Sequence, residues 1–117
     1  MLVQVHTDNH IQGDARLAEF VETQLVGSLE RFGDQVIRVE AYLADENSSE
    51  KQGANDKRCT IEARLAGLQP IAVHHRGATL EQAIDGAVEK LETTLDHTID
   101  RVGHKKGRTS FGGDQTI

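Results

Sequence analysis

The fold is decided by the stretch Gly77-Ala78-Thr79-Leu80-Glu81-Gln82-Ala83-Ile84-Asp85-Gly86-Ala87-Val88-Glu89-Lys90-Leu91. Apolar residues recur in it and beyond it at the spacing of one helix face, namely Leu80, Ile84, Ala87, Val88, Leu91, Leu95, Ile99 and Val102. Thr79 and Gln82 have the spacing of a capping box, in which two side chains satisfy free N–H groups at a helix start. The stretch therefore predicts a long amphipathic helix that begins near residue 80.

Upstream of this helix, four segments alternate apolar and polar residues, as strands with one buried face do. They cover residues 2–6, 37–43, about 57–66 and 71–76. The second strand is expected to turn Ile37, Val39, Ala41 and Leu43 toward the core. A first amphipathic helix lies between the first two strands, with Asp14 as its N-cap and Gly33 as its C-terminal stop.

The predicted order is β-α-β-β-β-α, which belongs to the α+β class. Two amphipathic helices would cover one face of a four-stranded sheet and leave the other face open, giving a two-layer sandwich. The first strand can pair in parallel with the strand after the crossover helix, and hairpins join the later neighbours. We expect residues 1–104 to form a single domain and residues 105–117 to form a flexible tail.

The second helix resembles a family signature. Its Ala83-Ile84-Asp85-Gly86 core and the following Lys90-Leu91 are similar to the corresponding helix of ribosome hibernation-promoting factors, also called ribosome-associated inhibitors or sigma-54 modulation proteins. Glu19-Phe20-Val21 and Leu29-Glu30-Arg31-Phe32 on the first helix extend the resemblance. It implies a fold akin to the double-stranded-RNA-binding domain. Because long members carry an additional C-terminal dimerisation domain, for which this chain has no room, we expect a short-form member.

The resemblance also implies a function. Such a protein would bind the small ribosomal subunit where messenger and transfer RNA bind, and would block translation sterically under stress. The expected partners are the small subunit and its ribosomal RNA, and no cofactor is expected. Among the candidate contact residues, only Lys90 comes from the matched motif.

The charge distribution bears on how RNA would be bound. The chain has 13 Lys and Arg against 19 Asp and Glu, a net charge of −6, and both helices are acidic where the resemblance implies basic residues. By alternation, arginines gather on the open sheet face with His6 and His74, offset by Glu40 and Glu62. The candidate RNA-contacting residues are Arg38, Arg58, Arg64, Arg76, Lys90 and Arg101. Two interpretations stay open for the sheet face: a phosphate-contacting surface, or a solvated face with ordinary cross-strand ion pairs.

Two other functional classes are considered. A divergent acidic member of the same fold could have lost ribosome binding and act as a protein–protein interaction or dimerisation module, including a homodimer. His97, Asp100 and His104 fall on one side of the second helix and are residue types that can hold zinc. Because no recognised zinc-site spacing occurs, a polar helix end is the favoured interpretation and we expect no metal.

Several functional classes are excluded by what the sequence lacks. It has no nucleophile elbow, P-loop or dinucleotide fingerprint, so a non-enzymatic protein is expected. Aromatic residues make up 3%, which argues against a base-stacking surface. Without an apolar run of about 18 residues, a signal peptide or a second cysteine, a cytoplasmic protein is expected. Cys59 alternates with Ile61, Ala63 and Leu65 and is predicted to be a buried strand residue.

Overall fold

The computed structural model describes residues 1–8, 11, 15–45 and 57–107, with the backbone alone for residues 101–107. The elements are β1 (Leu2–Thr7), α1 (Ala15–Leu29), a 3-10 helix η1 (Glu30–Gln35), β2 (Val36–Asp45), β3 (Lys57–Leu65), β4 (Ile71–Gly77) and α2 (Leu80–Gly107). This order confirms the predicted β-α-β-β-β-α arrangement. Asp14, the predicted N-cap of the first helix, lies outside the described residues.

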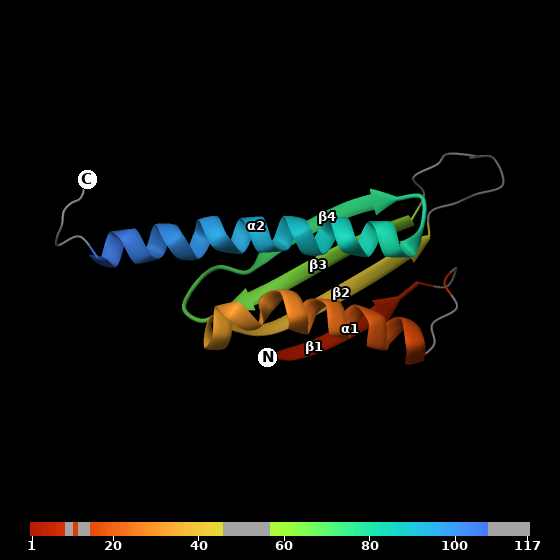
Figure 1. Cartoon of the computed structure of the whole chain (residues 1–117), viewed down its shortest axis with the longest axis horizontal. Coiled ribbons are helices and arrows are strands. Elements are labelled where there is room, and N and C mark those ends of the chain that lie inside the picture. Colours follow the sequence, from red (N-terminus) through yellow and green to blue (C-terminus); the bar gives the residue numbers. More distant parts are fainter. Residues whose placement is uncertain (9–10, 12–14, 46–56, 108–117) are drawn as a thin grey trace.

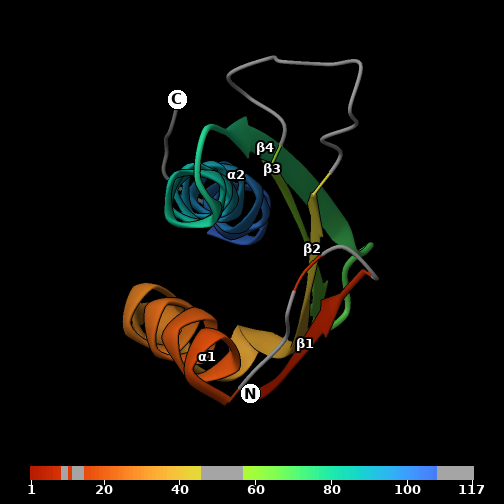
Figure 2. The ribbon, with the colours of Figure 1, turned by 90° about the vertical axis from the view of Figure 1, so that its right-hand side faces the viewer.

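The four strands form one mixed sheet in the order β1-β2-β3-β4. As predicted, β1 pairs in parallel with β2, and the remaining neighbours pair antiparallel. Figures 1 and 2 show both helices on the same face of the sheet, with α2 over the β3–β4 side and α1 over the β1–β2 side. In the described part of the chain no helix covers the opposite face, and this open face carries most of the predicted site residues.

The core lies between the sheet and the two helices. Its buried apolar residues are Val21, Leu25, Leu29, Val36, Val39, Ala41, Leu43, Cys59, Ile61, Ala63, Leu65, Ala83, Ile84, Ala87, Val88, Leu91 and Leu95. Burial raises the pKa of the Cys59 thiol to about 12. The predicted position of Cys59 on the inner face of a strand is confirmed, and the thiol stays protonated at neutral pH.

One inward-facing prediction is wrong. Ile37 is 49% exposed, whereas its neighbour Val36 is only 2% exposed. The β2–β3 register shifts between Val36 and Arg38, and such an irregularity interrupts the strict alternation of side chains. As a result the core receives Val36 in place of Ile37, and the alternation from Arg38 onward follows the prediction.

The first helix also ends earlier than its apolar stripe predicts. The α-helix stops at Leu29, and η1 carries the chain through Phe32 to Gln35. Gly33 has a φ of 60°, a conformation that glycine adopts without a Cβ penalty. The prediction that the chain leaves the helical path at Gly33 is confirmed, but the turn before it is a 3-10 helix.

At the start of α2 the capping box forms as predicted. The N–H of Gln82 donates to the Thr79 hydroxyl oxygen at 3.1 Å, and the Gln82 side-chain oxygen accepts from the N–H of Ala78 at 3.1 Å. At its other end α2 runs to Gly107, past the boundary expected at residue 104. Residues 108–117, the rest of the predicted tail, lie outside the described residues.

The N-terminal part of α2 lies directly on β4. A Cβ on Gly86 would overlap the imidazole ring of His75, so the absence of a side chain at this position lets the helix approach the strand. His75 is half-buried on the helix-covered side. No helix among the described residues is long and apolar enough to span a membrane.

Candidate nucleic-acid interface

The open face of the sheet carries the four predicted arginines in two rows that cross the strands. One row contains Leu2, Arg38 and Arg64, and another contains Ala44, Arg58 and Arg76. Two further rows lie between them. The first consists of Gln4, Glu40, Glu62 and Ala72, and the second of His6, Tyr42, Thr60 and His74.

The arginines therefore form two separate pairs at opposite ends of the sheet. From Arg58 to Arg64 the backbone of β3 covers about 20 Å at the usual rise per residue. Within each pair the two arginines are direct cross-strand partners, an arrangement that is unfavourable for like charges unless an anion lies nearby. The row with Glu40 and Glu62 interrupts the positive surface between the pairs.

Glu40 is the centre of a polar cluster on this face. Its Oε1 accepts a hydrogen bond from the Tyr42 hydroxyl at 3.0 Å and lies 3.0 Å from Nε2 of His6, while its Oε2 lies 3.1 Å from Nε of Arg38. Hydrogen bonds from Tyr42 and His6 and the charge of Arg38 lower the pKa of the Glu40 carboxyl. The same bond to Glu40 raises the pKa of the Tyr42 hydroxyl.

Within this cluster the Arg38 guanidinium is bound, and the side chains around it are held in place. The Arg38 guanidinium also donates to the side-chain oxygen of Gln4 at 3.0 Å, which ties β1 to β2. The rings of His6 and Tyr42 stack with their centroids 4.7 Å apart. For Arg38 the interpretation as an ordinary ion pair on a solvated sheet is thus the better one. Arg64 and Arg76 are the more exposed members of the two arginine pairs.

The helical layer presents the opposite charge. Its exposed carboxylates on α1, η1 and α2 are Glu19, Glu22, Glu30, Asp34, Glu81, Asp85, Glu89, Asp96 and Asp100. One of the arginines of this layer is already bound: both terminal nitrogens of Arg31 donate to the carboxylate of Asp96, at 2.8 and 3.0 Å. Gln24 donates to Asp85 at 3.1 Å and makes a second link between α1 and α2. These bonds hold the two helices together, and the charge of this layer disfavours contact with phosphates.

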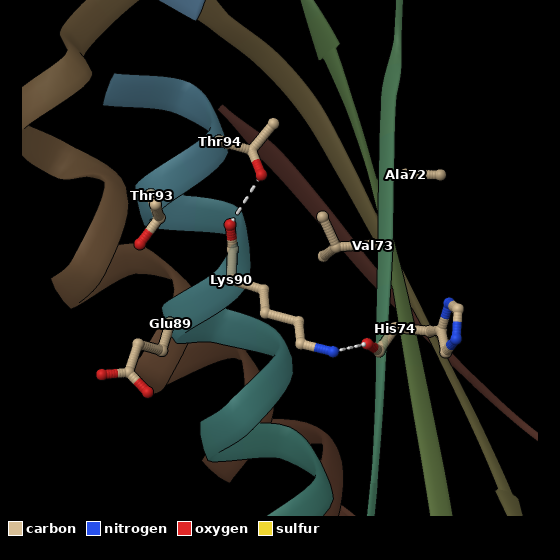
Figure 3. Close-up of a pocket in the computed structure, with 7 residues that line it drawn as sticks. All are labelled: Ala72, Val73, His74, Glu89, Lys90, Thr93 and Thr94. Atoms are coloured by element: carbon tan, nitrogen blue, oxygen red, sulfur yellow. Dashed lines mark hydrogen bonds between the residues drawn. The ribbon is translucent and has the colours of Figure 1, made fainter. Parts of the chain in front are cut away.

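Lys90, the residue that came from the family motif, lies in an open groove between α2 and β4. Figure 3 shows its side chain crossing to the strand, where Nζ donates to the carbonyl oxygen of His74 at 2.9 Å. The groove has a volume of about 510 Å³ and is lined by Ala72, Val73, His74, Glu89, Lys90, Thr93 and Thr94. Lys90 is therefore not part of the open sheet face.

The remaining predicted residues fall at the end of α2. The side chains of Arg101 and His104 lie outside the described part of the chain, so the RNA contact of Arg101 stays a prediction and the zinc alternative with His97, Asp100 and His104 stays untested. Within the residues whose side chains are described, no group of three or more His, Cys, Asp or Glu could hold a metal ion.

Sequence reasoning missed two features. The first is the cluster around Glu40. Its members on β2 are Arg38, Glu40 and Tyr42, and their spacing of two residues could have indicated their contact. The contribution of His6 depends on the β1–β2 register, which no local pattern specifies. The second missed feature is the Lys90 contact, because its acceptor is a backbone oxygen and leaves no trace in the sequence.

Comparisons with known proteins bear on the whole fold. The sequence matches the family model described as sigma 54 modulation protein / S30EA ribosomal protein over residues 3–102. The structure is similar to the Protein Y N-terminal domain of Thermus thermophilus, with 24% identity and a TM-score of 0.66 over 84% of this chain and 99% of that one. It is also similar to a ribosomal subunit interface protein from Coxiella burnetii, with 17% identity and a TM-score of 0.68 over 86% of this chain and 99% of that one. No curated protein matches the sequence.

Proposed function

Since this chain belongs to the sigma 54 modulation protein / S30EA ribosomal protein family, we propose that it is a non-enzymatic, ribosome-associated regulator of translation. The observation that carries the proposal is the family match over residues 3–102, which covers the four strands apart from Leu2 and most of α2. The likeness in fold to a ribosomal subunit interface protein agrees with it.

In the proposed mechanism the domain acts by occupying space. It binds the small ribosomal subunit where messenger and transfer RNA bind, and so promotes hibernation of the ribosome under stress. Binding to ribosomes would place the protein in the cytoplasm. No bond is made or broken, so what matters is which surface meets the RNA.

The open sheet face is the surface that we propose for this contact. Arg64 and Arg76 are exposed on it, and each lies beside a second arginine. Phosphates that reach these exposed guanidinium groups would accept charge-assisted hydrogen bonds from them and release counterions from the RNA. The helical layer has the wrong sign for this role, because its exposed carboxylates would repel a phosphate backbone.

The test is co-sedimentation of the protein with purified small ribosomal subunits across roughly 50 to 300 mM salt. We expect saturable binding that weakens steeply as salt rises, since phosphate contacts are screened and counterions compete. Absence of binding at the lowest salt would refute the proposal and would favour the alternative, a member of the fold that binds a protein partner or a second copy of itself.

Two charge reversals of equal size separate the surfaces. Arg64→Glu changes the open sheet face, and Arg16→Glu changes an exposed arginine of α1. If the sheet meets the RNA, Arg64→Glu weakens binding about tenfold or more and reduces the salt slope by about 1 per lost contact, while Arg16→Glu has little effect. The reverse result would assign the contact to the helices. Lys90→Gln and Arg101→Gln test the two remaining candidates in the same assay.

A further inference from the structure

The backbone groups at the outer edge of β4 take no part in the phosphate contacts proposed for the arginines of the open sheet face. In the strand order β4 is the last strand, and among the described residues only β3 pairs with it. The carbonyl oxygen of His74 accepts from Lys90 on α2, so this oxygen faces away from β3. Because backbone groups alternate sides in an antiparallel pair, those of Ala72 and Arg76 face the same edge.

Lys90 takes the position of a neighbouring strand's donor. A strand added at this edge would donate a backbone N–H to the His74 oxygen, and the ammonium group of Lys90 now supplies that hydrogen bond at 2.9 Å. A lysine at a sheet edge is a common device against indiscriminate strand pairing. The base of the Lys90 side chain is fixed on α2, where the Thr94 hydroxyl donates to the Lys90 carbonyl oxygen at 2.8 Å.

The space beside this edge can take an extended chain. The groove between α2 and β4 has a volume of about 510 Å³, and its apolar part includes Val73, which Figure 3 shows pointing toward α2. Lys90 reaches across it, whereas Figure 3 shows Glu89 pointing away from β4. On the other side of the strand His74 and Arg76 are exposed. A segment bound at this edge would therefore lie near the Lys90 ammonium group on one face of the sheet and near the His74 imidazole and the Arg76 guanidinium on the other.

We propose that the β4 edge binds an extended acidic segment of a partner protein by strand addition. In the free protein the Lys90 ammonium group occupies the His74 carbonyl oxygen, and a carboxylate of the segment displaces it from there. Lys90 leaves the His74 oxygen and pairs with a carboxylate, and a backbone N–H of the segment replaces it on that oxygen. Main-chain hydrogen bonds then supply affinity, and the carboxylate supplies selectivity. A neutral segment would leave the displaced ammonium group without a partner.

Charge also argues against a second copy of this chain as the occupant. A two-fold axis that passed by His74 would place this residue opposite the His74 of the other copy, and Lys90, bound to His74, would approach its own equivalent. Two ammonium groups at the axis repel each other, whereas an acidic strand neutralises the one that is there.

The experiment uses the full chain, isotopically labelled, and a fluorescent peptide of about ten residues with alternating valine and glutamate, the length of a long strand. A peptide with glutamine in place of glutamate removes the charge. A glutamate peptide methylated at each backbone nitrogen keeps the charge and removes the donors. Anisotropy gives the affinities, and amide hydrogen exchange at Ala72, His74 and Arg76 reports pairing at the edge.

We expect the glutamate peptide to bind about tenfold more tightly than the glutamine peptide, to protect the three amides, and to lose binding when methylated. In Lys90→Gln the two unmethylated peptides should bind alike; Arg16→Gln, which removes a cation from α1, should keep the tenfold preference. Equal binding of the methylated peptide would mean simple charge attraction and would overturn the proposal. A concentration-dependent dimer that protects the same amides, or protection by single-stranded RNA but by no peptide, would overturn it as well.

Discussion

The contact between His75 and Gly86 allows a matched pair of substitutions to test how closely α2 lies on β4. Gly27 on α1 has no heavy atom within 4 Å of the place where a Cβ would be, whereas a Cβ on Gly86 would overlap the His75 ring. Both glycines lie inside helices. Replacing either by alanine therefore gains about 1 kcal/mol of helix propensity.

This gain cancels in the comparison, so the difference between the two variants isolates the cost of overpacking. Gly27→Ala should stabilise the protein by about 1 kcal/mol. For Gly86→Ala the ring of His75 or the backbone of α2 must move, which typically costs about 1–3 kcal/mol and should offset or exceed the same gain. Urea unfolding followed by far-ultraviolet circular dichroism gives both free energies.

Adding His75→Ala serves as the control, because with the ring removed Gly86→Ala should become stabilising, as Gly27→Ala is. If Gly86→Ala alone stabilises the protein as much as Gly27→Ala does, the ring does not lie against the helix and the geometry of the β4–α2 layer described above is wrong.

Three further predictions concern single groups. The Arg31 hydrogen bonds lower the pKa of Asp96, so their contribution to stability is present above the usual Asp pKa of about 4 and is lost as pH falls through the folded-state pKa. The difference in the free energy of unfolding between wild type and Arg31→Ala should therefore shrink in that acidic window. A difference that does not change with pH would contradict the ion pair. Titration of Glu40 by carbon NMR should give a pKa below the usual Glu value, and Tyr42→Phe should raise it, because the Tyr42 hydroxyl is the largest cause of the shift. Cys59, buried and with its pKa raised to about 12, should resist a thiol reagent at pH 8 in the folded protein and react in urea; rapid reaction without urea would mean that the strand opens readily.

The order of elements could be predicted because each carries a local pattern. The apolar stripe of α2 and its Thr79–Gln82 cap specify a helix whatever it packs against, and strict alternation specifies the inner face of β3. Ile37 shows the limit of such patterns. Alternation on β2 placed it inward, but the irregularity at Val36 arises from pairing with β3, which is a property of two strands and not of one.

For the candidate site, the sequence predicted which arginines share a face but not how they are spaced. That Arg38 faces Arg64 and Arg58 faces Arg76 depends on the strand register. That Glu40 holds Arg38 depends on side-chain geometry as well. Lys90 shows a third limit, since a motif gives a residue's identity and not its partner, here a main-chain oxygen.

The parallel pairing of β1 with β2 has a kinetic consequence. Its partners lie far apart in the chain, Leu2 with Arg38 for example, whereas β3, β4 and α2 follow one another directly. Closing a long loop costs more entropy and slows pairing, so we expect β1 to dock last during folding and to detach first in native-state fluctuations. Each detachment takes Gln4 away from Arg38 and His6 away from Glu40. The exchange rate of the β1 amides would then measure how often Arg38 loses its Gln4 contact.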